Sequence, residues 1–140
     1  MKKSHFCALF CIVIFCLICS HSFAGEAEKD AIKAAEKWLI LIDGNDYGMS
    51  WENAAELLKK SIKKDKWEQM VKAVRPAFGD LISRSVKSAT YATSLPGAPD
   101  GEYVVIEFST NFANKKSASE QVTPMKDPDG EWRVAGYYIK

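Results

Sequence analysis

The stretch LPGAPDGEYVVIEFSTNF, residues 95–112, contains the clearest β-strand pattern in the chain. Its first half carries two glycines and two prolines, which favour tight turns because proline fixes φ and glycine permits positive φ. From residue 102 onward, β-branched and aromatic residues alternate between two faces. The more apolar face carries Val104, Ile106, Phe108, Thr110 and Phe112. The other face carries Tyr103, Val105, Glu107, Ser109 and Asn111. We therefore predict a strand over residues 102–114, with the first face toward the core and the second only partly covered.

Three helices are predicted before this strand. Residues 26–42 place alanines, Trp38 and Ile42 at helical spacing, and Gly44 ends the pattern. A short second helix over residues 51–58 would follow Ser50 as its N-cap. The third helix would begin at Asp65 and would kink or end at Pro76.

Three further strands are predicted around the first, over residues 81–93, 117–126 and 131–139. Pro124 lies within the third in chain order, which indicates an edge position or a bulge because proline cannot donate to the ladder. Helices followed by a meander of strands predict an α+β fold, with about three helices on one face of a curved four-stranded antiparallel sheet. Such a fold forms a cone whose open mouth could hold a small ligand.

The N-terminal segment has the pattern of a secretory signal peptide. Lys2 and Lys3 precede an apolar run over residues 6–19, and small residues at Ser22 and Ala24 suit a cleavage site. We therefore predict that residues 1–24 are removed and that residues 25–140 form a single domain in the periplasm or outside the cell. That domain would have no stable membrane anchor; a retained anchor is the alternative reading.

Composition excludes several chemistries from the predicted mature chain. All four cysteines and both histidines lie in residues 1–24, so residues 25–140 offer no disulfide, no thiol nucleophile and no ordinary zinc site. We expect no cofactor and no metal. The 19 basic residues include Lys2 and Lys3, so 17 remain against 18 acidic ones, and this balance argues against nucleic acid as a partner.

Several segments together resemble the bacterial secreted family called domain of unknown function 4019. They are AEKWL at 35–39, Trp67, Arg75-Pro76 with Gly79, Arg84, LPGAPDGEYVV at 95–105, FANK at 112–115 and EWRVAGYYI at 131–139. The resemblance spans residues 34–140. It implies a small exported domain of Gram-negative bacteria in the NTF2-like, or cystatin-like, class. It implies no activity.

Candidate site residues fall into three groups. The aromatic residues that could line a ligand pocket, or alternatively belong to the core, are Tyr47, Trp51, Trp67, Tyr91 and Trp132. The arginines of the mature chain are Arg75, Arg84 and Arg133. Arg84 and Arg133 lie in predicted strands and could hold a carboxylate ligand, or form an internal ion pair with Glu107 or Glu120. The plausible general acids or bases are Asp43, Asp46, Glu107 and Glu120, and among these Glu107 and Glu120 are the catalytic candidates.

These residues leave three hypotheses open, of which a non-catalytic module that binds a small molecule or a peptide is preferred. The second is a homodimer that covers Tyr103 and Val105 together with Tyr137 or Tyr138. The third is a small enzyme that uses Glu107 or Glu120 as a base. Five lysines of residues 59–66 add a charged face for acidic partners or lipid heads, or simply for solvent.

Overall fold

The computed structural model describes the backbone of residues 19–140 and the side chains of residues 25–140. Most of the predicted signal peptide, residues 1–18, lies outside the described residues, whereas residues 19–24 form the start of the first helix. The helices are α1 (Cys19–Asp43), α2 (Tyr47–Glu52), α3 (Glu56–Ser61), α4 (Lys64–Val74) and the 3₁₀ helix η1 (Arg75–Phe78). The strands are β1 (Leu81–Ala92), β2 (Tyr103–Phe112), β3 (Lys115–Lys126) and β4 (Trp132–Ile139).

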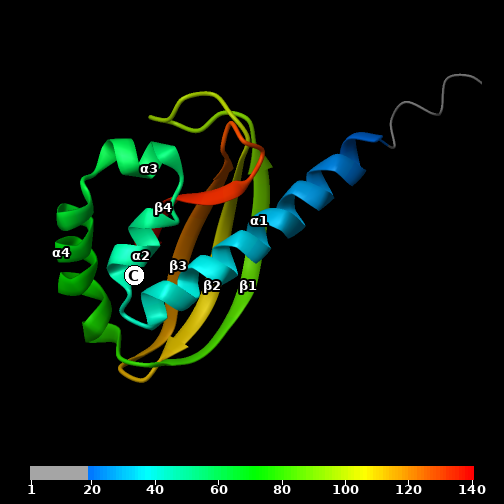
Figure 1. Ribbon diagram of the computed structural model, residues 1–140. Coiled ribbons are helices and arrows are strands. Elements are labelled where there is room, and N and C mark those ends of the chain that lie inside the picture. The colour runs from blue at the N-terminus through cyan, green and yellow to red at the C-terminus, as the bar shows by residue number, and fades with distance from the viewer. Residues whose placement is uncertain (1–18) are drawn as a thin grey trace, which may run out of the picture.

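The four strands form one antiparallel sheet in the order β1-β2-β3-β4, so each strand pairs with its neighbour in the chain. Figure 1 shows α1 crossing one face of this curved sheet, while α2, α3 and α4 gather to one side of it. The predicted α+β fold is thereby confirmed. The NTF2-like class that the resemblance implies stays an expectation.

The core lies between α1 and the inner face of the sheet. Ala31 and Ala35 of α1 are fully buried, and such small side chains let a helix approach a sheet closely. Opposite them, the predicted apolar face of β2 is buried along its whole length, from Val104 to Phe112. The interior of the predicted cone is therefore packed with side chains.

The predicted second helix is wrong in detail, because two short helices occupy this region. Helix α2 begins four residues before Trp51, where the Asp46 side chain accepts from the Met49 N–H; Ser50 does not cap it and is buried within it. Between α2 and α3, the Ala55 N–H donates to the Val134 carbonyl of β4 at 2.8 Å. This contact with the sheet diverts the main chain, which no local pattern reveals.

Two prolines behave largely as their chemistry requires. Helix α4 ends at Val74, and Pro76 stands at the start of η1, as predicted. Pro124 lies beside a β-bulge, which was one of the two expectations, but β3 is an inner strand, so the edge position is wrong. An inner strand tolerates Pro124 because the bulge interrupts the ladder there.

Candidate functional site

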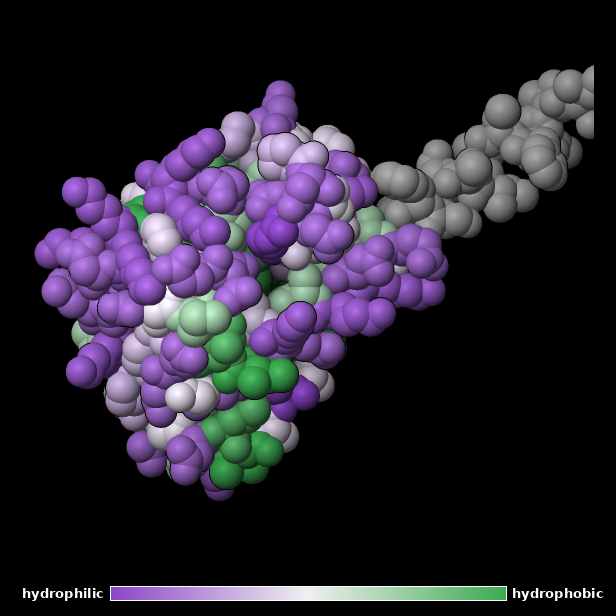
Figure 2. Space-filling view, in the orientation of Figure 1, coloured by the Kyte–Doolittle hydropathy of each residue, from purple (hydrophilic) through white to green (hydrophobic). Residues whose placement is uncertain are grey.

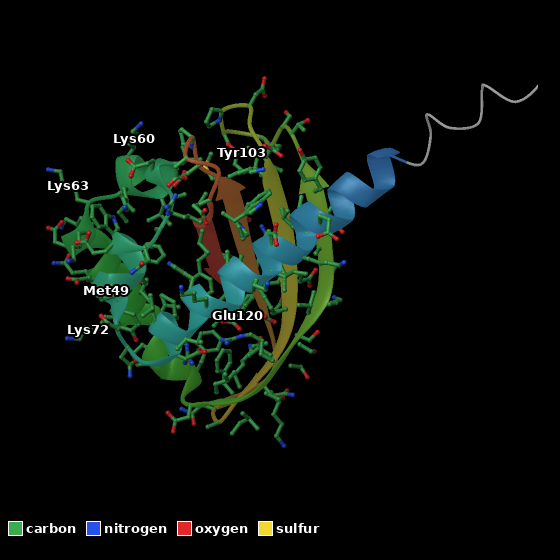
Figure 3. The ribbon with its side chains drawn as sticks, turned by 45° about the vertical axis from the view of Figure 1, so that its right-hand side comes forward. Met49, Lys60, Lys63, Lys72, Tyr103 and Glu120 are labelled. Atoms are coloured by element: carbon green, nitrogen blue, oxygen red, sulfur yellow. The ribbon has the colours of Figure 1, made fainter. Side chains whose placement is uncertain are left out.

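A buried ionic network, consisting of Asp43, Arg75, Arg84, Thr110, Glu120 and Tyr137, lies between the end of α1 and the sheet. Glu120 of β3 is fully buried, and Figure 3 shows it beneath the C-terminal half of α1. Its carboxylate accepts hydrogen bonds from Arg84 Nε, Thr110 Oγ1 and Tyr137 Oη, each at 2.7 Å. The pairing of Arg84 with Glu120 is one of the two internal ion pairs considered from the sequence.

Asp43 extends the network at the last residue of α1. Its carboxylate accepts from Arg84 Nη1 at 2.7 Å and from Arg75 Nη2 at 3.1 Å. Arg75 is buried above the ring of Phe112, at 4.3 Å from the centroid, and it also donates to the Gly79 carbonyl at 2.7 Å. Two arginines thus neutralise two carboxylates, and every oxygen of Asp43 and Glu120 has a donor.

The network shifts the pKa of two of its members, Arg84 and Tyr137. Burial lowers the pKa of the Arg84 guanidinium, but the hydrogen bonds to Asp43 and Glu120 outweigh burial, and the pKa rises above its ordinary value. Burial raises the pKa of the Tyr137 hydroxyl, and the neighbouring Glu120 carboxylate raises it further. Arg84 therefore stays cationic and Tyr137 stays neutral at ordinary pH. Their hydrogen bonds are made to other residues of the fold, so the network stabilises the fold.

The second catalytic candidate, Glu107, lies on the opposite face of the sheet, in partial contact with solvent. It accepts from Lys87 Nζ at 3.1 Å and from Ser119 Oγ at 3.2 Å. The hydrogen bond from Lys87 lowers the pKa of the Glu107 carboxyl. Glu107 and Glu120 therefore do not share a site, because they point to opposite faces of the sheet.

All five aromatic candidates lie in the core or pack against it, and three of them come from the helical side of the molecule. Trp67 is buried, and its ring centroid lies 6.0 Å from that of Trp38. Its Nε1 donates to the Ser50 hydroxyl at 2.9 Å. Tyr47 is also buried. Trp51 packs on the core while its Nε1 donates to the Ile62 carbonyl. The core reading, which the sequence left open, describes their position.

Tyr91 and Tyr137 also pack against the core, whereas the tyrosines of the proposed dimer face differ in exposure. Tyr91 is half-buried at the end of β1, and its hydroxyl donates to Glu102. Tyr103 is almost fully buried, and its hydroxyl donates to the Pro99 carbonyl of the turn before β2. Tyr137 points inward against Trp38, at 5.4 Å between ring centroids, so Tyr138 is the exposed tyrosine of β4.

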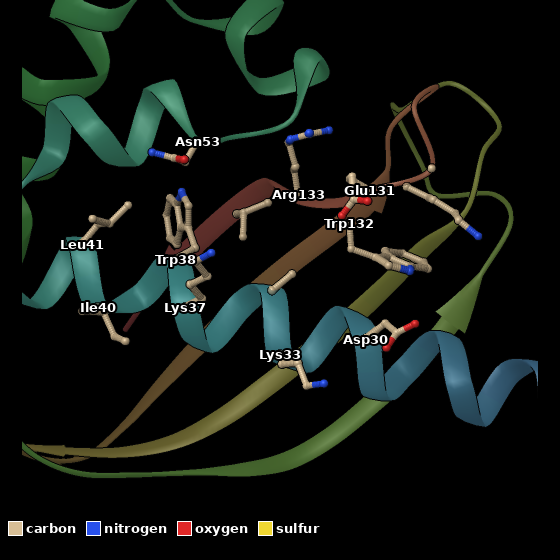
Figure 4. A pocket seen from close by; sticks show the side chains of 14 residues that line it. Asp30, Lys33, Lys37, Trp38, Ile40, Leu41, Asn53, Glu131, Trp132 and Arg133 are labelled. Carbon is tan, nitrogen blue, oxygen red and sulfur yellow. The ribbon is translucent and has the colours of Figure 1, made fainter.

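A groove of about 940 Å³ opens between α1 and the start of β4, and we call it the α1–β4 groove. Figure 4 shows Trp132 reaching from β4 toward α1, above Asp30, while Arg133 points the opposite way. The groove is lined by Asp30, Lys33, Ala34, Lys37, Trp38, Ile40, Leu41, Asn53, Lys126, Gly130, Glu131, Trp132, Arg133 and Val134. Four of these side chains are cationic and two are acidic. Arg133 and Lys126 pair with acidic residues outside the lining. The cations that the groove leaves available are therefore Lys33 and Lys37.

Arg133 is the one arginine candidate at this groove. Its guanidinium donates to Asp127 Oδ2 at 3.1 Å and to Asp129 Oδ2 at 2.8 Å, in the turn between β3 and β4. The hydrogen bond from Arg133 lowers the pKa of the Asp129 carboxyl to about 2. These pairs hold the turn at the rim of the groove; Arg133 and Asp129 are open to solvent, whereas Asp127 is buried.

Sequence reasoning missed the helix wall of the groove. Lys33 and Lys37 were not singled out, although they lie one helical turn apart beside the apolar stripe of α1. That spacing is the signal that could have found them, but it is shared by most solvated helix faces. Trp132, by contrast, was among the aromatic candidates.

The helical side of the molecule carries a second hollow and the lysine-rich link. The hollow, about 850 Å³, lies between α2 and α4, and its acidic lining residues are Asp46, Asp65 and Glu68. In the lysine-rich link, Lys64 pairs with Glu52 at 2.8 Å. Lys60 and Lys63 are exposed and point away from the protein body (Figure 3). The link is therefore a solvated face with local ion pairs.

Residues 34–137 match a family described as "Protein of unknown function (DUF4019)". The chain belongs to the DUF4019 family. The matched residues include β1 to β3, β4 except its last two residues, the buried network and all of the β4 side of the groove. The chain has no match among curated proteins.

Within residues 19–140, no helix is both long and apolar enough to cross a membrane. The same residues contain no cluster of three or more histidine, cysteine or acidic side chains that could hold a metal ion.

Proposed function

We propose that this DUF4019 domain is an exported, non-catalytic binding module that takes a small anionic molecule or a peptide in the α1–β4 groove. The observation that carries the proposal is the composition of that groove. Aromatic and aliphatic walls from Trp38, Leu41 and Trp132 lie next to a lining with more cations than carboxylates. Pockets that bind small molecules combine apolar walls with a few polar groups in this way.

Binding is favoured over catalysis because the buried carboxylates are already engaged. A general base must reach the proton that it removes, but Glu120 and Asp43 are enclosed by arginine and hydroxyl donors. The carboxylates that line the groove, Asp30 and Glu131, are exposed to solvent, whereas burial is what strengthens a carboxylate as a base.

Export rests on the sequence of the N-terminal segment. The proposed cleavage after Ala24 would shorten α1 to begin at Gly25, and it would retain the buried positions Ala27 and Ala31. N-terminal sequencing of the protein from the periplasm or medium should give Gly25 first. A chain that keeps Met1 and sediments with membranes would support the retained anchor instead.

Ligand binding is tested by thermal shift with a panel of organic anions and short acidic peptides, because a ligand that binds the folded state raises Tm. The stabilisation should be lost in Trp132→Ala and Lys37→Ala, which remove one wall and one cation of the groove. Tyr138→Ala is the matched control, since it removes an exposed aromatic side chain from the same strand. No stabilisation by any compound class would overturn the proposal.

Self-association is a second candidate role, favoured by an apolar patch that adjoins the groove at Ile40. Figure 2 shows hydrophobic residues gathered where the C-terminal half of α1 meets the start of β1, within a mostly hydrophilic surface. The exposed apolar residues of these two elements are Ile40, Leu81, Ile82 and Val86. Contiguous apolar patches on a surface mark interaction sites. Sedimentation equilibrium at high micromolar concentration should show dimers that Ile82→Ser weakens; a monomer excludes this role.

A further inference from the structure

The free edge of β4 opens onto the α1–β4 groove, and the hydrogen-bonding register of the strand shows which main-chain groups it presents. β4 is the last strand of the sheet, so one of its sides has no neighbouring strand. At Val134 that side is occupied, since the carbonyl accepts from the Ala55 N–H at 2.8 Å. The partner of Val134 across the ladder is Pro124, which has no N–H to donate.

The same register continues toward the start of β4. In an antiparallel strand, the N–H and C=O of alternate residues point to the same side. Trp132 therefore directs both main-chain groups to the free edge, as Val134 does. Its partner across the ladder, Lys126, points its own N–H the other way, to the Glu102 carbonyl at 2.9 Å. Among residues 19–140, no loop or turn bonds to the main chain of Trp132.

We propose that the α1–β4 groove binds an extended acidic peptide that adds to β4 at Trp132 by main-chain hydrogen bonds. The inference rests on the proposed function and specifies its ligand. Addition of a strand supplies affinity through the main chain, while the groove selects alternate side chains. A ligand without peptide groups would not supply the donor and acceptor that match the Trp132 carbonyl and N–H at this edge.

The groove has the length and charge that such a peptide requires. The α1 wall runs from Asp30 to Leu41, which corresponds to about 16 Å at the helical rise per residue. A strand rises about 3.3 Å per residue, so about five extended residues fit along this wall. Lys33 and Lys37 make no ion pair with other residues of the described chain, and they are available to acidic side chains or to a terminal carboxylate.

The inference is tested with peptides selected from a random displayed heptamer library against the exported protein produced from the full chain. Selected peptides should be acidic, and titration should shift the amide and indole NMR signals of Trp132. Methylating the peptide nitrogens one at a time should weaken binding about tenfold at the one nitrogen that donates to the Trp132 carbonyl and leave the other positions unaffected, because the next carbonyl on that edge, at Val134, is already bonded to Ala55. A single sensitive nitrogen is the signature of main-chain pairing at Trp132.

Two variants of β4 distinguish the contribution of the Trp132 main chain to peptide binding from that of its side chain. Trp132→Ala keeps the N–H and removes the indole, whereas Trp132→Pro removes both, so the proline variant should bind about tenfold more weakly than the alanine variant. Far-UV circular dichroism identifies a variant that fails to fold, in which case the methylation scan decides alone. Tyr138→Ala should bind as the unmodified protein does.

The failures of the two proposals are distinguishable. If small organic anions stabilise the protein in a Trp132-dependent way while no library peptide binds, the peptide inference is overturned and the groove remains a ligand site. Selected peptides whose methylation scan shows no single sensitive nitrogen, or whose NMR shifts fall away from Trp132, also overturn it. If neither anions nor peptides bind, the proposed function itself fails.

Discussion

Arg84 and Arg133 lie on different strands of one sheet, and each binds two carboxylates. The two groups differ in how far their side chains are exposed to solvent. Arg84 joins Asp43 and Glu120, with side-chain exposures of 11%, 17% and 0%. Arg133 joins Asp127 and Asp129, with exposures of 32%, 5% and 55%. The same chemical pairing is thus enclosed by the fold at one place, whereas at the groove the arginine and one of its two carboxylates, Asp129, are open to solvent.

The difference teaches that an arginine–carboxylate pair is not by itself a functional site. Breaking a buried pair leaves an uncompensated charge in a poorly solvated place, so such pairs constrain the fold. Exposed pairs contribute little to stability, and their groups can exchange partners with water or ligand. This contrast is the reason for assigning structure to the Arg84 network and binding to the groove.

The largest expected effect comes from removing Arg84. Arg84→Ala leaves Glu120 fully buried without its cation and should destabilise the fold by about 3–5 kcal/mol. Arg133→Ala, the matched control, should cost less, about 1 kcal/mol, because Arg133 is itself partly exposed and its Asp129 partner is open to solvent, although Asp127 is buried. Urea unfolding measures both. Equal unfolding midpoints for the two variants would remove the distinction between the two regions.

A smaller effect is expected from a single hydroxyl of the buried network. Tyr137→Phe keeps the ring against Trp38 but removes the 2.7 Å hydrogen bond to Glu120. Hydrogen bonds to charged groups contribute about 1.5–3 kcal/mol, and the variant should be destabilised by that amount. Tyr138→Phe, one residue away and exposed, should have the same free energy of unfolding as the unmodified protein. An equal loss of stability in both variants would contradict the network's role.

The exposed pair should respond to pH in a range set by Asp129. Its pKa is about 2 in the folded protein against an ordinary 3.8, because Arg133 donates to the carboxylate. A lowered folded pKa means that the stabilisation is complete above pH 3.8 and is lost as the pH falls toward 2. An NMR titration of the Asp129 carboxyl should show this midpoint, and Arg133→Ala should return it toward 3.8. A titration that Arg133→Ala leaves unchanged would contradict this pairing.

The smallest effect on stability is expected at the helix wall of the groove. Lys37→Ala removes an exposed side chain of α1 and should change the free energy of unfolding by less than about 0.5 kcal/mol. The same variant should weaken binding of the acidic ligands proposed above. Stability and affinity measured on one preparation would therefore separate the two regions, since Arg84→Ala affects folding and Lys37→Ala affects binding. A Lys37→Ala protein as unstable as Arg84→Ala would show that the groove wall is structural.

Local pattern predicted most of the architecture. Alternation over residues 102–114 identified the buried face of β2, and helical spacing identified the buried stripe of α1, because both depend on the geometry of a single element. The boundary between α2 and α3 was missed, since it depends on a hydrogen bond from Ala55 to Val134, far along the chain.

The sequence by itself determined the family, the α+β class, the order of helices and strands, and the absence of cysteine and histidine from residues 25–140. Tertiary structure decided which charges meet. Arg84 reaches Glu120 across 36 residues and Asp43 across 41, and Trp132 faces α1 across the groove. The physical reason is that periodicity orients a side chain on its own element, whereas burial and pairing are set by the elements packed against it.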